Sequence, residues 1–473
     1  MEHTLTARTL VAGVDSSTQS TKVVVCDAET GEVVRTGRAP HPDGTEVHPR
    51  HWWDAYQAAT ADGLLDGVSA LAVGGQQHGM VALTAGDEVV RDALLWNDTR
   101  SSGAAADLVQ ELGGPAAWVD AVGLVPVASF TVTKLRWLAR HEPSNASRVS
   151  RVVLPHDWIT GRILQADGGF EQWTTDRGDA SGTGYFAAET GEYRRDLLEL
   201  AFGRDLALPA VLGPSQVAGR TSSGMVVAAG TGDNMGAALG LVLEPGDVVV
   251  SLGTSGTVFT PHEKPIQDDT GAIAAFADAT GNYLPLMCTL NAARVLTTGA
   301  AMLGVSLGEL DALALSAQPG AGGLTLLPYL DGERTPDLPD ATGSLHGLTR
   351  ANGTPQNLAR AVVEGMLCNV GAGVAALRAH GVQVDRVLMI GGASASAAVQ
   401  EIAPAIFGVP VVVPAAGEYV GIGAARQAAW ALSGAVAPPD WALGVDAEFH
   451  ADPDSATGLV SRYSELVHAT YGV

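Results

Sequence analysis

Two valine-rich runs joined by a short polar stretch open the chain. Residues 10–14 and 22–26 are rich in β-branched valine, and the small polar residues 15–21 separate them. Runs of this kind on either side of a turn are typical of a β-hairpin. After a turn at Thr30-Gly31, residues 32–36 are predicted to add a third strand.

The next segment predicts a helix and then a buried strand. The helix is expected over residues 51–65, directly after Pro49. The apolar run 68–73 predicts a fourth strand, which ends at Gly74-Gly75.

The same order of elements returns in the second half of the chain. The predicted elements are a hairpin of residues 247–250 and 257–259 around the polar stretch 251–256, strands over 272–277 and 283–287, helices over 291–302 and 357–380, and a strand over 386–390 that ends at Gly391-Gly392. A pattern repeated at about half the chain length indicates two duplicated domains.

Glu244-Pro245-Gly246 marks the predicted domain boundary. We therefore expect an N-terminal domain over residues 1–243 and a C-terminal domain over 244–440. Residues 441–473 are predicted to form a crossing segment rich in Pro and Asp, followed by a helix over 455–471.

Composition narrows the class of protein. The 473 residues are 46% hydrophobic and 16% charged, which is a globular composition with room for two cores. The net charge of −24 would repel nucleic acids and anionic membranes, so neither is an expected partner.

The three cysteines do not have the spacing of a disulfide framework or a zinc site. Neither an apolar leader over residues 1–9 nor a run of about 18 apolar residues is present. These features lead us to expect a cytoplasmic protein.

The polar turn from Asp15 to Lys22 could bind phosphate. It offers successive backbone N–H groups and hydroxyls, and residues 251–256 offer the same in the second half. Two such turns facing each other would grip a polyphosphate, while Asp15 could hold Mg2+. Either turn alone is more often an ordinary β-turn, and it is their pairing at equivalent points that favours phosphate binding.

Asp233 is the candidate general base. It is the acid of the glycine-rich stretch 228–234, where a substrate can approach the backbone closely. Considered alone, an acid in such a loop is more often a turn or helix-cap residue.

Residues 76–79 (QQHG) follow a predicted strand and supply amide and imidazole groups suited to sugar hydroxyls. Trp96 brings an indole that could pack on a sugar face. Core packing of Trp96, or a structural role for His78, explains either residue equally well.

Together these motifs resemble the two-domain carbohydrate kinases of the ribonuclease H-like superfold, which also includes actin and heat-shock chaperone ATPases. The resemblance runs from about residue 9 to about residue 430. The motifs that carry it lie, in this order, at 76–79, 95–98, 129–137, 179–183, 232–234, 251–256, 327–330, 332–336 and 343–348, followed by Glu364.

The resemblance implies two duplicated α/β domains with the active site in the cleft between them. It implies the following roles: Asp233 as general base; Asp15 as the residue that organises Mg2+ and the γ-phosphate; Lys22, Thr18 and, opposite them, Thr254 as phosphate contacts; Gln77, His78, Trp96 and Asn234 as the lining of the sugar pocket; and Gly391 and Gly392 against the adenosine of ATP.

The chain departs from the family pattern in two places. Ser17 stands where the first turn usually has glycine, and Ala393, Ser394 and Ala395 replace a further glycine and a following arginine near the adenosine. The first departure bears on the phosphate turn, and the second on nucleotide affinity.

The expected reaction is ATP-dependent phosphorylation of a small ketose, and the motifs are most similar to those of members that act on D-xylulose. Ribulose, gluconate and glycerol remain alternatives on the same fold, although glycerol kinases carry Asp-Gln where this chain has Asp233-Asn234. A non-catalytic ATP-binding switch of actin or chaperone type is a further alternative. The oligomeric state stays open, with a homodimer as the candidate assembly.

Overall fold

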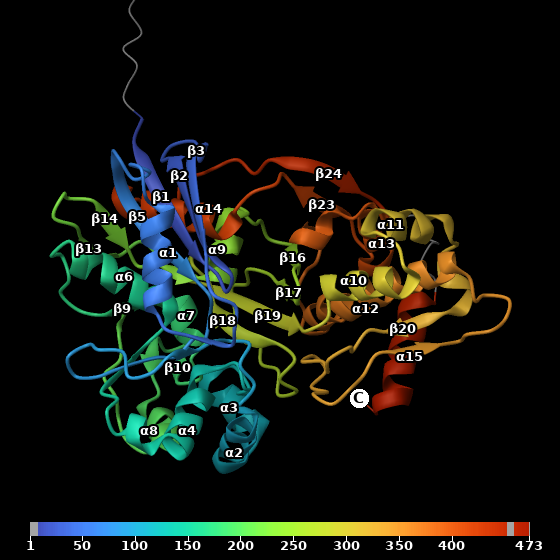
Figure 1. Cartoon of the computed structure of the whole chain (residues 1–473), viewed down its shortest axis with the longest axis horizontal. Helices are drawn as coiled ribbons and strands as arrows, with labels where there is room; N and C mark the ends of the chain where they lie inside the picture. The colour runs from blue at the N-terminus through green and yellow to red at the C-terminus, as the bar shows by residue number, and fades with distance from the viewer. Residues whose placement is uncertain (1–7, 452–457, 473) are drawn as a thin grey trace, which may run out of the picture.

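The computed structural model describes residues 8–451 and 458–472 and shows two halves, each built on one large sheet (Figure 1). In the first sheet the strand order is β13-β14-β5-β1-β2-β3, with β15 beside β5. These strands are β1 (Leu10–Ser16), β2 (Ser20–Asp27), β3 (Val33–Pro40), β5 (Val68–Gly75), β13 (Val217–Arg220), β14 (Val226–Ala228) and β15 (Thr231–Gly232).

The second sheet has the order β18-β19-β17-β16-β22-β23-β24. Its strands are β16 (Asp247–Leu252), β17 (Gly256–Phe259), β18 (Ala274–Ala277), β19 (Tyr283–Thr289), β22 (Arg386–Ile390), β23 (Val411–Pro414) and β24 (Val445–Phe449).

The two sheets share one topology. Strand β1 pairs antiparallel with β2 and parallel with β5, and β16 pairs antiparallel with β17 and parallel with β22. Each half therefore starts with a hairpin whose first strand lies beside a later parallel strand. This arrangement confirms the predicted pair of duplicated α/β domains.

Helices cover both sheets. They are α1 (Arg50–Ala59), α2 (Ser102–Leu112), α3 (Pro115–Val122), α4 (Thr131–His141), α5 (Pro143–Ala146), α6 (Pro155–Ala166), α7 (Arg177–Ser181), α8 (Arg195–Phe202), α9 (Asp233–Gly240), α10 (Ala293–Leu303), α11 (Leu307–Ser316), α12 (Pro355–Ala379), α13 (Ala397–Phe407), α14 (Tyr419–Ser433) and α15 (Leu459–Tyr471).

Short strand pairs and two 3-10 turns complete the described elements. The pairs are β4 (Glu46–Val47) with β7 (Ala93–Leu94), β6 (Val81–Leu83) with β8 (Arg151–Val153), β9 (Thr174–Asp176) with β12 (Ala210–Leu212), β10 (Phe186–Ala187) with β11 (Glu192–Tyr193), and β20 (Thr325–Leu327) with β21 (Ser344–His346); the turns are η1 (Ala321–Gly323) and η2 (Gly392–Ala395).

Several predicted bounds are wrong. The helix predicted over 51–65 is α1 (Arg50–Ala59), because the backbone at Asp62 and Gly63 turns to positive φ. The predicted crossing segment contains strand β24, which pairs with β23 and so extends the second sheet. At the start of the predicted last helix, residues 455–457 lie outside the described residues, as do residues 1–7 at the N-terminus.

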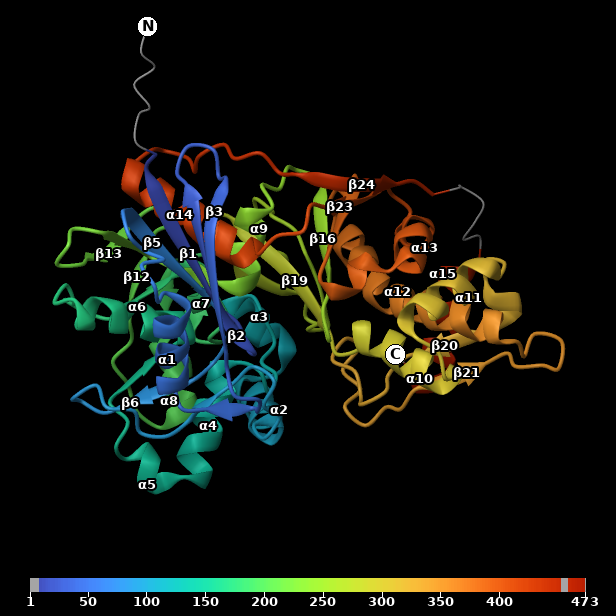
Figure 2. The ribbon, with the colours of Figure 1, turned by 45° about the horizontal axis from the view of Figure 1, so that its top comes forward.

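Helix α14 packs on the first sheet although it lies within residues 244–440. Its buried alanines, among them Ala424 and Ala428, share a core cluster with Val11 and Ala70 of the first sheet. Figures 1 and 2 both show α14 beside α9 and that sheet. The chain thus returns to the first half before β24 crosses back, and the division at residue 243 stays a prediction.

Helices α9 and α14 cross at very close range. A Cβ on Gly423 would lie 1.8 Å from the carbonyl oxygen of Gly236, and one on Gly240 would lie 2.2 Å from that of Tyr419. Only glycine fits at these crossing points. Since Asp233 is the first residue of α9, this crossing fixes where its carboxylate lies.

Helix α12 is the long apolar helix of the second half. By length and composition it could cross a membrane, but 78% of its most apolar window is buried inside the protein. The core cluster of the second half surrounds it, which is the setting of a core helix.

We predict that Gly423→Ala lowers the free energy of unfolding by about 1–3 kcal/mol, because the added methyl group overlaps the backbone of α9. Gly103→Ala is the matched control: a Cβ at this α2 position meets nothing within 4 Å, so no loss is expected. Urea unfolding measures both variants. Equal stability of the two variants would contradict the close crossing.

Candidate active site between the two halves

Two adjoining cavities lie between the halves and share Asp233, Asn234 and Ser251 in their walls. The smaller, of about 230 Å³, also contains Gln77 and is called the Gln77 cavity here. The larger, of about 680 Å³, contains Gly391 and is called the Gly391 cavity. Asp233 thus stands where one cavity meets the other.

The Gln77 cavity brings together Gln77, His78, Trp96, Asp233 and Asn234, all predicted from sequence, and it also includes Thr18. Asn234 donates from Nδ2 to Gln77 Oε1 at 2.9 Å. The buried Nε2 of Gln77 has no partner among the described residues. A buried donor without a partner is costly, which makes it suited to a ligand oxygen.

His78 follows β5 in a strained conformation with φ of +66°. Its Nδ1 lies 2.8 Å from the carbonyl oxygen of Gly182, which can only accept, so Nδ1 carries the hydrogen. Burial, together with the nearby charges of Lys134 and Arg334, holds the pKa of His78 well below its usual value. The neutral ring therefore offers Nε2 as a hydrogen-bond acceptor.

Trp96 joins the first polar turn to this cavity. It is half-buried, and its Nε1 donates to Thr18 Oγ1 at 2.9 Å. It lines the Gln77 cavity instead of a closed core, so simple core packing does not describe it. Gly253 and Ser255 of the second polar turn line the same cavity, and the two turns therefore face one space.

Ser17 fits its turn without strain. It is not among the residues with positive φ, and its backbone N–H and Oγ both donate to Ser20 O, at 3.1 and 3.0 Å. The serine at this position therefore closes the turn without needing glycine.

The Gly391 cavity contains Asp15, Lys22, Gly391 and Gly392. Gly391 has φ of +91°, and a Cβ there would lie 2.7 Å from the backbone of Leu252. A Cβ on Gly392 would meet nothing within 4 Å. Thr254, at the exposed tip of the second hairpin, is the predicted site residue that lines neither cavity.

Lys22 holds two carboxylates together. Its Nζ lies 2.7 Å from Glu418 Oε2 and 3.3 Å from Asp15 Oδ2. Burial opposes its charge, but these carboxylates raise the pKa of Lys22 overall. Burial also raises the pKa of Asp15 to about 6 despite the opposing effect of Lys22.

The second oxygen of Asp15 suits a cation. Oδ1 is buried and has no partner among the described residues, while Oδ2 faces Lys22. Mg2+ commonly uses one or two protein carboxylates and takes its other ligands from water and phosphates. A group of three or more His, Cys, Asp or Glu side chains arranged so that it could hold a metal ion is not found in the described ranges. The single carboxylate of Asp15, with its unpartnered oxygen, matches the way Mg2+ is commonly bound.

Asp233 is half-buried and lies near other acids. Burial, with the charges of Asp15 and Asp179, raises its pKa to about 7. Its Oδ1 accepts from the backbone N–H of Asn234 at 2.8 Å, so it also supports the first turn of α9. A carboxyl with a pKa near neutrality can accept a proton and release it again.

A buried ionic cluster lies behind this acid. His156 Nδ1 is 2.8 Å from Asp179 Oδ2, and Asp157 and Asp176 lie within 3.6 Å of its Nε2. Although burial opposes the charge, these carboxylates raise the pKa of His156 to about 9. The histidine thus offsets part of the negative charge beside Asp233.

Arg334 and Glu418 are charged residues of the site that had no predicted role. Arg334 lines the Gln77 cavity from the second half, and Glu418 lines the Gly391 cavity beside Lys22. The charged residues of the motif at 332–336 could have pointed to Arg334. Glu418 is 396 residues from Lys22, and no local pattern indicates their contact.

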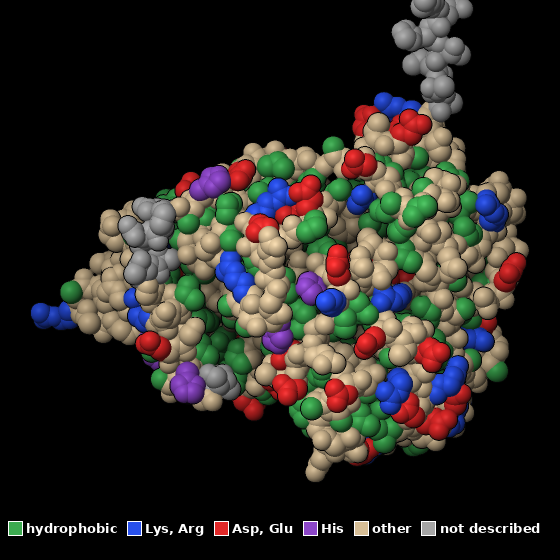
Figure 3. Space-filling view, turned by 180° about the vertical axis from the view of Figure 1, so that it is seen from behind, with side chains coloured by type: hydrophobic (Ala, Val, Ile, Leu, Met, Phe, Trp, Pro, Cys, Tyr) green, Lys and Arg blue, Asp and Glu red, His purple; other side chains and the backbone are tan. Residues whose placement is uncertain are grey.

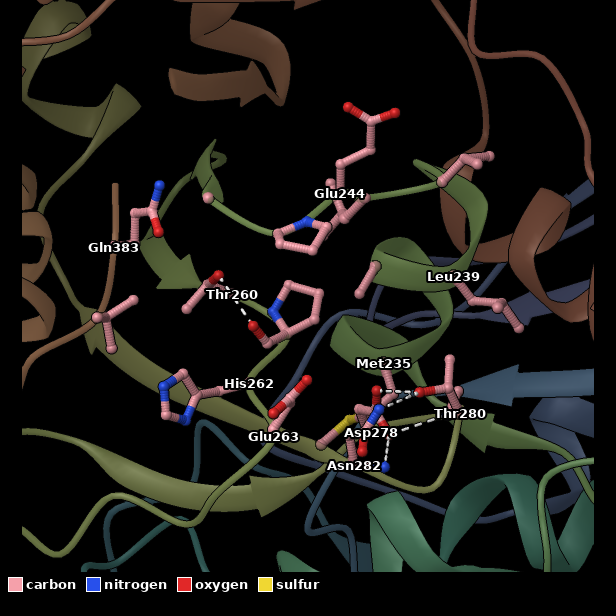
Figure 4. Close-up of a pocket in the computed structure, with 18 of the residues that line it drawn as sticks. Met235, Leu239, Glu244, Thr260, His262, Glu263, Asp278, Thr280, Asn282 and Gln383 are labelled. Carbon is pink, nitrogen blue, oxygen red and sulfur yellow. Dashed lines mark hydrogen bonds between the residues drawn. The ribbon is translucent and has the colours of Figure 1, made fainter. Parts of the chain in front are cut away.

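A third cavity, of about 760 Å³, opens beside α9 at the connection between the halves. Three of its polar side chains are bonded to one another: Figure 4 shows Asp278 bonded to Thr280, which in turn accepts from Asn282. Asp233 and the other predicted site residues do not line it. On the face shown in Figure 3, Lys and Arg side chains lie among Asp and Glu and do not gather into one basic area.

Comparison with known proteins agrees with this geometry. The model of the FGGY family of carbohydrate kinases, N-terminal domain, matches residues 10–240, and that of the C-terminal domain matches residues 248–432. A xylulose kinase of Streptomyces coelicolor is 47% identical over 440 residues, which cover 90% of this chain and 88% of that protein.

Solved structures are similar as well. The crystal structure of xylulose kinase from Bifidobacterium adolescentis has a TM-score of 0.90 and 47% identity, with 97% of this chain and 99% of that chain covered. Plasmodium falciparum glycerol kinase with ADP has a TM-score of 0.84 and 17% identity, with 98% of each chain covered. The second similarity concerns the fold alone.

The raised pKa of Asp233 predicts how its replacement changes stability with pH. Between the ordinary pKa of 3.8 and about 7, the folded protein binds more protons than the unfolded chain, so this group destabilises the fold as pH rises. Asp233→Asn removes that effect. We expect the variant to exceed wild type in stability at pH 8 by clearly more than at pH 5, in urea unfolding without ligands. An equal difference at both pH values would contradict the raised pKa.

Proposed function

The chain belongs to the FGGY family of carbohydrate kinases, and we propose that it phosphorylates D-xylulose with ATP, giving D-xylulose 5-phosphate and ADP. The observation that carries the proposal is the position of Asp233 in the walls of both cavities. The identity of 47% to named xylulose kinases supports the choice of sugar.

In this proposal the Gln77 cavity holds the sugar. Gln77 donates from its unpartnered Nε2, and His78 accepts at Nε2. Trp96 gives an apolar wall against the C–H face of the sugar. Asn234, which positions the amide of Gln77, completes the set.

The Gly391 cavity holds the nucleotide. Gly391 and Gly392 allow the adenosine to lie close to the backbone. Asp15, Lys22 and Ser251, which line the same cavity from the two halves, would face the phosphates. Lys22 contributes positive charge, and Asp15 would hold Mg2+, which neutralises phosphate charge when bound. Thr254, at the tip of its turn, would contact phosphate from the second half.

Asp233 acts on the attacking hydroxyl. It orients the hydroxyl toward the γ-phosphorus and takes its proton as the new O–P bond forms and the bond to the ADP oxygen breaks. Phosphoryl transfer relies mainly on alignment and charge stabilisation, so this proton transfer comes late. Closure of the halves around both substrates would exclude water that would otherwise hydrolyse ATP.

Two finer points belong to the same proposal. The protein would work in the cytoplasm, where ATP and sugar are available. Its assembly stays open, with a homodimer as the candidate.

We predict that Asp233→Ala retains sugar binding but loses about 10²- to 10⁴-fold in kcat, the usual value of a general base. Coupled ADP-release assays measure kcat, and titration calorimetry measures sugar binding. Glu244→Ala is the control, because that side chain is 75% exposed and lines neither of the two cavities. Wild-type turnover in Asp233→Ala would remove this residue from the mechanism.

A panel of acceptors tests the substrate. D-xylulose is expected to stimulate ADP release at least tenfold more, in kcat/KM, than ribulose, gluconate or glycerol. Preference for another acceptor would keep the kinase reaction but change the sugar. ATP turnover that ignores every acceptor would instead favour a switch of actin or chaperone type.

A further inference from the structure

Arg334 brings a positive charge from the second half of the molecule into the Gln77 cavity. It lies in the loop between β20 and β21, yet it shares this cavity with Gln77 and His78 of the first half. In the parts of the chain that the structure describes, no carboxylate oxygen lies within 4.0 Å of its guanidinium nitrogens, so Arg334 forms no ion pair there. An arginine without a carboxylate beside a substrate cavity is available to a ligand.

The backbone around Arg334 is firmly held. The adjacent Glu333 is 1% exposed, and its carboxylate accepts from Leu290 N at 2.6 Å and from Asn291 and Asn369 at 3.0 and 2.8 Å. The same carboxylate accepts from Arg334 N at 2.7 Å. The side chain of Arg334 is thus presented from a fixed loop.

The guanidinium itself makes few contacts. Nη1 donates to Ser129 Oγ at 2.5 Å, and the group lies over the ring of Phe130 at 5.5 Å from its centroid. Both partners belong to the first half and line the same cavity. An arginine has five N–H donors, so this one side-chain hydrogen bond leaves most of them for other oxygens.

The position of Arg334 indicates which oxygens these are. Asp233 lines both cavities, so the hydroxyl that receives phosphate lies at their junction. Arg334 lines the Gln77 cavity but not the Gly391 cavity, which places it away from the nucleotide. Its planar fork matches two neighbouring oxygens better than a single one.

We propose that Arg334 is a further sugar-binding residue, which donates hydrogen bonds to oxygens of the ketose other than the phosphate-accepting hydroxyl. This proposal rests on the proposed function. Because the other ligands of the sugar belong to the first half, a bound sugar would touch both halves through Arg334. Sugar binding would thereby favour their closure.

The test measures sugar affinity without turnover. Titration calorimetry of D-xylulose, in the absence of nucleotide, is carried out on the wild type, Arg334→Lys, Arg334→Gln and the control Arg294→Gln. Arg294 also approaches this loop, since its Nη1 lies 3.3 Å from Asp331, but it does not line the cavity. Thermal unfolding and KM for ATP are measured on every protein.

Arg334→Gln is expected to raise the sugar Kd at least tenfold and to leave KM for ATP within about twofold, and Arg334→Lys is expected to lie between it and the wild type. Arg294→Gln should match the wild type. A rise in sugar Kd of less than threefold in the folded Arg334→Gln variant would overturn the proposal. If Arg334→Gln fails to fold, Arg334→Lys decides, with a threefold rise in Kd as the supporting result.

Wild-type protein that neither binds nor phosphorylates D-xylulose contradicts the proposed function instead, and the same series is then run with the acceptor it does use.

Discussion

A half-buried carboxylate at the meeting point of two cavities is the constraint on which this structure depends. Asp233 has a pKa of about 7 because burial and two nearby acids disfavour its charge. The same environment makes it basic enough to take a proton from a hydroxyl. Its placement therefore lowers the stability of the fold while it raises the basicity of the carboxylate. Packing elsewhere in the protein has to offset this loss of stability.

The duplicated topology positions this acid. In each half a hairpin turn lies at the end of a strand that pairs with a parallel neighbour, so both turns reach the space between the sheets. Helix α9 carries Asp233 into that space, and α14 fixes α9 through glycine contacts that leave no room for side chains. A segment from late in the chain thus secures a residue from its middle.

Local patterns in the sequence predicted much of this. Gln77, His78 and the two polar turns follow strand ends, where the chain must leave the sheet, and valine-rich runs identify those strands. The pattern predicted a helix to residue 65, whereas α1 ends at Ala59, since positive φ at Asp62 is incompatible with a longer helix. The docking of α14, the pairing of Lys22 with Glu418 and the entry of Arg334 into the Gln77 cavity join residues far apart in the chain, and local patterns contain no information about them.

The charges around Lys22 explain how an acidic protein can bind an anionic nucleotide. Asp15 and Glu418 share one ammonium group, and Asp233 stands in the wall of the same cavity, so carboxylates outnumber cations there. A bare triphosphate would meet net repulsion, whereas a phosphate that arrives with a divalent cation would not. The unpartnered oxygen of Asp15 lies where such a cation can be received. The charge of the site would then by itself favour the metal-bound nucleotide over the free one, whatever contacts the protein makes with the adenine.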